Sequence, residues 1–109
     1  MLRVVDRQTI EEAVQRLLEA APEGSRVILF GSHARGQADP ASDVDFLVVE
    51  PQVEDAFAEE VRLINVLRPL RLAVDVVVVS RDEFRYWKDT PNTLPYEAVQ
   101  EGDPHGPIA

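Results

Sequence analysis

Apolar residues along the chain follow two periods, one typical of amphipathic helices and one typical of buried strands. Helical spacing predicts helices over residues 9–21 and 53–67, and shorter helices that follow Ser80 and Thr93. Compact runs of branched and aromatic residues, bounded by Gly, Ser or Pro, predict three strands, at 27–30, 43–49 and 72–79. Helices that alternate with strands indicate an α/β fold.

Local signals mark where the helices begin, end and face the core. Thr9 with Glu12, and Ser80 with Glu83, have the spacing of a capping box, so we expect helices to start at Thr9 and Ser80. Gly102 is well placed to end the last helix. One face of the helix at 53–67 is expected to pack on the core through Val53, Phe57, Val61, Ile64 and Leu67.

The strands at 43–49 and 72–79 are nearly continuous in apolar residues, as expected for strands that are covered on both faces. The helix between them predicts a right-handed parallel crossover. The dozen residues between the first two strands are enough to reverse the chain direction. We therefore expect a small mixed β-sheet with flanking helices.

Composition limits the kinds of function that are open to this chain. A length of 109 residues suits one domain, and we expect it to cover residues 1–102, followed by a loose tail at 103–109. The sequence has no cysteine, which excludes disulfides, iron–sulfur clusters and thiolate zinc sites. A net charge of −9 argues against direct nucleic-acid binding. No apolar stretch has the length of a membrane span, and acidic residues near the N-terminus do not suit a secretory signal, so a cytoplasmic protein is expected.

Two acids stand at the start of the second strand. Asp43 and Asp45 are two residues apart and therefore project to the same face. Buried and unpaired, they would repel each other and lose hydration, so they need arginine partners, exposure at the strand end or a divalent cation. Mg²⁺ suits the arrangement because it takes one or two carboxylates and completes its shell with water and phosphate oxygens.

Asp75 interrupts the most apolar strand of the chain, where sheet packing gives no reason for a charge. If the second and third strands pair, Asp75 can converge on Asp43 and Asp45, and three carboxylates around one point suit a two-metal phosphoryl-transfer site. The structural alternative is an ion pair of Asp75 with Arg71 or Arg26.

Gly31 and Ser32 follow the first strand directly. A glycine there lets the backbone approach a ligand, and a short helix beginning at Ser32 would present N–H groups and a dipole to an anion such as a triphosphate. The alternative is an ordinary turn. Gly31 and Gly36 have the spacing of a P-loop, but Gln37-Ala38 stands where Lys-Ser/Thr is required.

The segment Phe-Gly-Ser-x-Ala-Arg-Gly at 30–36, followed by Ser-Asp-x-Asp-Phe-Leu-Val-Val at 42–49, resembles the signature of the minimal nucleotidyltransferases. These belong to the DNA polymerase β-like superfamily, which includes kanamycin nucleotidyltransferase and poly(A) polymerase. The resemblance covers about residues 7–102. It implies a short mixed sheet with flanking helices, two Mg²⁺ ions, and transfer of a nucleoside monophosphate from an NTP to an acceptor.

The same resemblance implies roles for individual residues. Gly31 and Ser32 would hold the β- and γ-phosphates, and Asp43 and Asp45 would ligate the two metals. Asp75 would ligate the metal that activates the acceptor hydroxyl. Arg35 matches the motif arginine, which would contact the triphosphate or form a structural ion pair. His33 occupies a variable motif position and is interpreted as a surface residue. The residues after Gly102 contain two prolines and do not favour a further strand.

The catalytic core takes up almost the whole sequence, so we expect the acceptor surface to come from a partner or a second subunit. Minimal nucleotidyltransferases are commonly paired with HEPN-domain proteins in toxin–antitoxin systems. The resemblance therefore implies an antitoxin that moves AMP from ATP to a tyrosine hydroxyl on a HEPN toxin. Two alternatives stay open: a binding module that neutralises its partner by docking, and a small-molecule nucleotidyltransferase of the antibiotic-resistance type.

Overall fold

The computed structural model describes residues 5–31, 33–34, 36 and 43–105 of the chain. Helices and strands alternate along most of it, as the apolar pattern predicts. In chain order the elements are α1 (Arg7–Ala20), β1 (Arg26–Phe30), β2 (Val44–Glu50), α2 (Ala56–Leu67), the 3₁₀ turn η1 (Arg68–Leu70), β3 (Val74–Ser80), α3 (Arg81–Trp87), α4 (Leu94–Glu101) and β4 (Asp103–His105).

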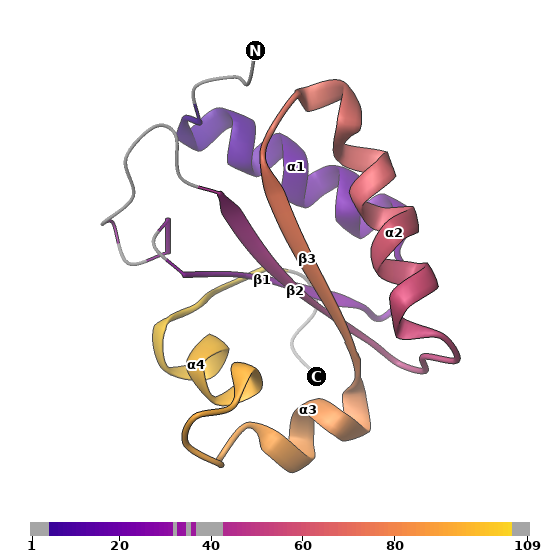
Figure 1. The fold of residues 1–109 in the computed structure, drawn as a ribbon, viewed down its shortest axis with the longest axis vertical. Coiled ribbons are helices and arrows are strands. Elements are labelled where there is room, and N and C mark those ends of the chain that lie inside the picture. The colour runs from indigo at the N-terminus through magenta and orange to yellow at the C-terminus, as the bar shows by residue number, and fades with distance from the viewer. Residues whose placement is uncertain (1–4, 32, 35, 37–42, 106–109) are drawn as a thin grey trace.

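The four strands form one mixed sheet in the order β3-β2-β1-β4 (Figure 1). β2 and β3 are parallel and are connected through α2, whereas β1 runs antiparallel to both β2 and β4. The small mixed sheet and the parallel crossover are therefore confirmed, and the chain does reverse between β1 and β2. This topology makes β2 a central strand and β3 an outer one.

Helices cover both faces of the sheet (Figure 1). On one face α1 and α2 pack over alternate strand residues, among them Val27, Leu29 and Phe46. On the other face α3 and α4 contribute Phe84 and Ala98 to a smaller core cluster that also contains Ile28, Leu47 and Val49. Because successive strand residues point to opposite faces, the same strands serve both clusters.

The cap of α1 differs from the sequence prediction. Asp6 is the N-cap, and one oxygen of its carboxylate accepts hydrogen bonds from both the backbone N–H and the hydroxyl of Thr9, each at 2.7 Å. The prediction that Thr9 itself caps the helix is wrong, because Asp6 offers a stronger acceptor three residues earlier. The cap of α3 is confirmed: the N–H of Glu83 donates to the Ser80 hydroxyl at 3.1 Å.

The buried face of α2 also differs from the prediction. Leu63 and Leu67 are buried, whereas Phe57 is 75% exposed and Val61 43% exposed, so these two residues were wrongly assigned to the core. The helix is oriented partly by Glu60, whose carboxylate accepts a 2.9 Å hydrogen bond from the backbone N–H of Val78 on β3. That polar contact to the edge of the sheet is invisible to an argument from apolar spacing.

The chain after α4 forms a strand rather than a loose segment. Gly102 ends α4, as predicted, and residues 103–105 then pair with β1 as β4. The expectation of a loose tail is thus wrong for 103–105, since the backbone hydrogen bonds of an open sheet edge outweigh the poor strand preference of Pro104. Residues 106–109 lie outside the described residues.

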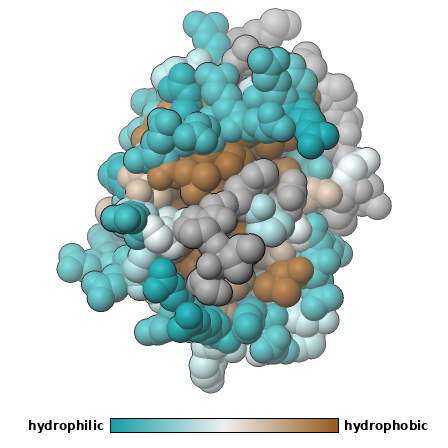
Figure 2. All heavy atoms as spheres, turned by 180° about the vertical axis from the view of Figure 1, so that it is seen from behind, coloured by the Kyte–Doolittle hydropathy of each residue, from teal (hydrophilic) through white to brown (hydrophobic). Residues whose placement is uncertain are grey.

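Seen from the opposite side, hydrophobic residues form a band across the middle of the molecule, between hydrophilic residues above and below it (Figure 2). The band corresponds to the arrangement of a sheet sandwiched between amphipathic helices, whose polar sides face outward. Within the part of the chain that the structure describes, no helix is long and apolar enough to cross a bilayer.

Candidate functional site

Two of the three predicted acids are direct neighbours in the sheet. Asp45 on β2 pairs in register with Asp75 on β3, and on its other side Asp45 pairs with Phe30 at the end of β1. Adjacent strands lie about 4.8 Å apart, and residues in register share a face, so the two carboxylates project side by side. The parallel crossover through α2 is what brings together two acids 30 positions apart in the sequence.

The turn after β1 packs directly against one of these carboxylates. Gly31 has a φ of 76°, a conformation that favours glycine. A Cβ added to Gly31 would collide with Oδ2 of Asp45 and lie 3.3 Å from its Cγ. Gly31 is therefore required for two reasons, its backbone conformation and the space that the Asp45 carboxylate occupies.

Asp43 lies just before β2, on the same face as Asp45 by the alternation of the strand. Its neighbour Val44 is fixed by a 2.9 Å hydrogen bond from its N–H to the carbonyl of Ala73, which precedes β3. Asp43 and Asp75 are both exposed and Asp45 is half-buried. For Asp43 and Asp75 the fold therefore uses exposure at the end of the sheet, which keeps these two acids hydrated.

The structural alternative for Asp75 finds no support in the described residues. Arg26 stands at the other end of β1, and no ion pair joins Asp75 to Arg71 or to Arg26 in the described part of the chain. The charge of Asp75 is thus accessible to a ligand rather than used to stabilise the fold.

The carboxylate oxygens of these acids are suitable ligands for a hard divalent cation, but they supply only part of a metal site. Carboxylate oxygens are the ligands that Mg²⁺ prefers, and two neighbouring acids are enough when water and phosphate oxygens complete the shell. However, the described residues contain no group of three or more His, Cys, Asp or Glu side chains gathered to hold a metal ion. Asp45 with Asp75 is therefore the pair that fits the ion, and Asp43 stands beside it without closing a three-acid cage.

The remaining predicted site residues lie in or near the loop after β1. Ser32 and Arg35 fall outside the described residues. His33 is half-exposed and lines a cavity of about 450 Å³ together with Leu29 and residues at the start of α1. That cavity opens beside the Gly31 turn, on the sheet face opposite to Asp45, because Leu29 and Phe30 point to opposite sides.

The structure also contains a titratable cluster that the sequence analysis missed. Glu50, at the far end of β2 from Asp45, is 2% exposed, and burial together with a hydrogen bond to Glu59 raises its pKa to about 8. Arg62 holds Glu59 with two hydrogen bonds, of 2.6 and 2.8 Å, and donates a third to the carbonyl of Ala20. A signal was present in the sequence, since Glu50 directly follows the apolar run of the second strand.

Comparison with solved structures finds the same fold in two other proteins. A structure described as a toxin–antitoxin with AMP-PNP superposes with a TM-score of 0.63 at 24% identity, covering 86% of this chain and 70% of that chain. A putative nucleotidyltransferase from Sulfolobus solfataricus superposes with a TM-score of 0.55 at 28% identity, covering 75% of this chain and 73% of that chain. Comparison with curated proteins gives no match.

Comparison with protein-family models identifies the family of the chain. The model for the nucleotidyltransferase domain matches residues 8–100, a span that runs from α1 to α4 and includes the Gly31 turn, Asp45 and Asp75. The chain therefore belongs to the nucleotidyltransferase domain family.

Proposed function

We propose that this protein is a Mg²⁺-dependent nucleotidyltransferase that moves AMP from ATP to a hydroxyl group, specifically a tyrosine of a HEPN-domain toxin, and so acts as an antitoxin. Membership of the nucleotidyltransferase domain family supports nucleotidyl transfer in general. The choice of acceptor rests on the resemblance of the 30–49 segment to minimal nucleotidyltransferases and on the structural likeness to a toxin–antitoxin bound to AMP-PNP.

The observation that carries the proposal is the in-register pairing of Asp45 with Asp75 beside the Gly31 turn. Asp45 and Asp75, with Asp43 beside them, would hold two Mg²⁺ ions, which would supply charge compensation for the triphosphate and the departing pyrophosphate. Gly31 and Ser32 would hold the β- and γ-phosphates. Exposure of Asp75 supports access by an acceptor that belongs to another protein.

In the proposed reaction the acceptor oxygen forms a bond to the α-phosphorus of ATP while the bond from that phosphorus to the bridging oxygen breaks. Pyrophosphate leaves with the electron pair of the broken bond. The hydroxyl proton leaves towards Asp75 and then to solvent, because a carboxylate beside the acceptor favours its deprotonation. Asp45 would hold the Mg²⁺ ion that offsets the charge of the triphosphate beside the Gly31 turn.

The test is to incubate the purified chain with a HEPN-domain partner, ATP and Mg²⁺, and to record the intact mass of the partner. We expect added AMP with the unmodified chain and none with Asp45→Asn. Glu23→Gln is the matched control, because it also removes one exposed carboxylate but lies in the loop after α1. Absence of added AMP with every nucleotide and metal tried, despite a stable complex, would contradict the proposal.

A non-catalytic docking module is the second candidate, and one observation favours it: the described acids do not form a group of three suited to a metal ion. Under this alternative Asp45→Asn would still neutralise the partner as well as the unmodified chain does. Under the catalytic proposal the variant would bind the partner but leave its activity intact. Assaying the ribonuclease activity of the partner with both forms separates the two candidates.

A further inference from the structure

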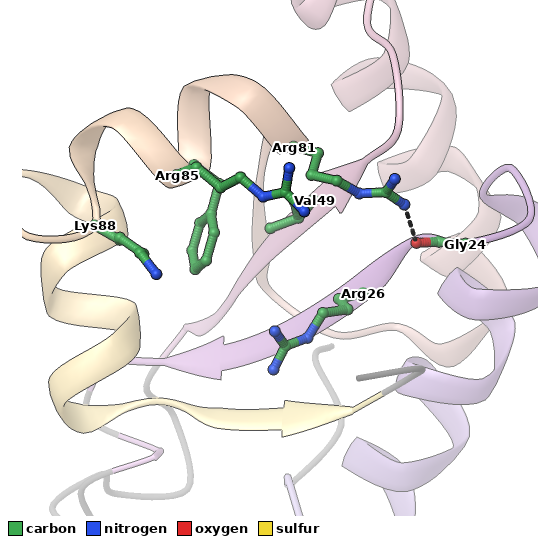
Figure 3. Close-up of a pocket in the computed structure, with 7 residues that line it drawn as sticks. Gly24, Arg26, Val49, Arg81, Arg85 and Lys88 are labelled. Atoms are coloured by element: carbon green, nitrogen blue, oxygen red, sulfur yellow. Dashed lines mark hydrogen bonds between the residues drawn. The ribbon is translucent and has the colours of Figure 1, made fainter. Parts of the chain in front are cut away.

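Four cationic side chains surround one cavity at the end of the molecule away from Asp45. Arg26 from β1 and Arg81, Arg85 and Lys88 from α3 and its C-terminus line a cavity of about 120 Å³, together with Gly24, Val49 and Phe84 (Figure 3). The whole chain has only 11 Lys and Arg against 20 Asp and Glu. Four cations around one cavity are therefore a strong local departure from the acidic character of the protein.

These cations have few partners of their own. Arg81 donates a 3.3 Å hydrogen bond to the carbonyl of Gly24, and no ion pair involves any of the four in the described part of the chain. The Nε of Arg26 is buried and has no hydrogen-bond acceptor. Like charges held close together repel each other, and a buried donor without an acceptor opposes folding. An anion in the cavity would relieve both penalties.

A second cavity adjoins the first and shares three of its lining residues, Arg26, Phe84 and Lys88. It measures about 290 Å³, and its wall is partly apolar. The other residues that line it are Ile28, Asp89, Ala98, Val99, Gly102 and Pro104. A ligand with an anionic group and a less polar body could therefore occupy both cavities at once.

The cationic cavity is separate from the candidate catalytic acids. Along β1, Arg26 pairs with Val49 and Phe30 pairs with Asp45, so the two places lie at opposite ends of the same strand. Four residues of extended strand span about 13 Å. The side chains of these four strand residues all lie on the face covered by α3 and α4. The core residues Ile28 and Leu47 lie between the two ends.

We propose that this cavity binds a phosphorylated small molecule, with the phosphate among Arg26, Arg81, Arg85 and Lys88 and the body of the ligand in the adjoining cavity. Guanidinium groups present several N–H donors in a fixed plane and match the oxygens of a phosphate in a bidentate manner. A cavity of about 120 Å³ favours a compact anion over an extended acidic peptide. The inference does not depend on the proposed transfer reaction.

The test uses inorganic phosphate and AMP as probes, in EDTA so that no metal assists binding elsewhere. Backbone amide resonances of the ¹⁵N-labelled chain are followed during each titration. We expect saturable shifts at Val49, Phe84 and Lys88, and tighter binding of AMP than of phosphate because AMP also fills the adjoining cavity. Arg85→Gln, at an exposed position that the fold does not need, should weaken AMP binding about tenfold or more.

Two controls make the result decisive. Arg68→Gln removes another exposed cation, on η1, and should leave AMP affinity unchanged, while Asp45→Asn should leave the shifts near Phe84 unchanged. Absence of shifts around the cavity, equal losses in Arg85→Gln and Arg68→Gln, or equal affinity for phosphate and AMP would overturn the proposal. A glutamate-rich peptide that shifts these resonances where AMP does not would also overturn it, in favour of an acidic protein segment.

Discussion

Glu50 and Glu59 share a side-chain hydrogen bond, and the two carboxyl groups titrate in opposite directions. Burial and the bond to Glu59 raise the pKa of Glu50 from 4.5 to about 8, whereas hydrogen bonds from Arg62 and Glu50 lower the pKa of Glu59 to about 2. At neutral pH Glu50 is therefore protonated and donates to the Glu59 carboxylate. The pair fixes the start of α2 to the end of β2 and, through Arg62, to the end of α1.

This relationship predicts a maximum in stability at mildly acidic pH. Between pH 4.5 and about 8 the folded chain binds the Glu50 proton more tightly than the unfolded chain, so stability falls as pH rises through this interval. Between about 2 and 4.5 the opposite holds for Glu59, so stability falls as pH drops. Denaturant unfolding at a series of pH values measures both limbs.

Glu50→Gln should remove the fall in stability between pH 4.5 and about 8 and keep the fall below pH 4.5. The amide can still donate a hydrogen bond to Glu59 but has no proton to lose, so stability should stay nearly level from pH 5 to 8. Glu54→Gln, at an exposed position nearby, is the control and should keep the full pH dependence. If stability of the Glu50→Gln variant still fell between pH 5 and 8, another group would be responsible for this pH dependence.

Gly31→Ala tests the close approach of the loop to the candidate site. The substitution introduces a Cβ that collides with the Asp45 carboxylate and also places alanine at a φ of 76°. Gly36→Ala is a matched control, since Gly36 has a φ of 70° but nothing within 4 Å of an added Cβ. We expect Gly36→Ala to lose about 1 kcal/mol of stability from backbone strain alone.

For Gly31→Ala we expect a larger loss of stability than for Gly36→Ala, together with loss of AMP transfer, because Asp45 must move. Unfolding free energies and the intact-mass assay measure the two effects. Equal behaviour of the two variants would mean that Asp45 has room to rotate away without consequence.

Asp75→Asn separates chemistry from stability. Asp75 is exposed and has no ion pair with Arg26 or Arg71, so we expect its replacement to change unfolding free energy by no more than about 0.5 kcal/mol. Nucleotidyl transfer should be lost, since a carboxylate next to Asp45 disappears. Destabilisation by several kcal/mol with activity reduced only in proportion would identify Asp75 as a structural acid.

Gly102→Ala probes the close packing of the end of α4 on β1. An added Cβ would collide with the carbonyl oxygen of Ala98 and with Cγ2 of Ile28, although the φ of −80° is normal for alanine. Overpacking of this kind costs about 1–3 kcal/mol, which thermal unfolding should show as a lower midpoint. Gln100→Ala, at an exposed position on the same helix, should change the midpoint little.

Leu63→Ala and Phe57→Ala test the observed orientation of α2. Leu63 is 0% exposed, so truncation should cost about 2–5 kcal/mol, while truncation of Phe57, which is 75% exposed, should stay within about 0.5 kcal/mol. Denaturant unfolding of both variants gives the comparison. Similar losses in the two would support the orientation expected from apolar spacing instead.

Much of the fold could be predicted because apolar runs and caps are local signals. The three long strands, the parallel crossover and the Ser80 cap follow from residues that are close in the sequence. The predictions failed mainly where residues that are far apart in the sequence determine the structure. Glu60 orients α2 through β3, and β4 forms because β1 has an open edge. The start of α1 is a local exception, because Asp6 competes with Thr9 from three residues earlier.

The same distinction applies to the candidate site. The sequence suggested that Asp75 would approach Asp45, but only pairing of the strands sets the register that makes them direct neighbours. The contact between Gly31 and Asp45 depends on the reversal of the chain after β1, which spacing cannot fix. The cations of the cavity lined by Arg26 and Arg81 come from β1 and from α3 and its C-terminus, about 55 residues apart in the sequence, so no sequence motif indicates them.

The hydrogen bond between Glu60 and the N–H of Val78 has a consequence for assembly. β3 is an outer strand, and such strands readily add a strand from another molecule. Here a carboxylate already occupies one of the outward donors, and its charge would meet the backbone carbonyls of any incoming strand. Extension of the sheet across β3 is thereby disfavoured, which directs assembly with other chains to surfaces other than this edge.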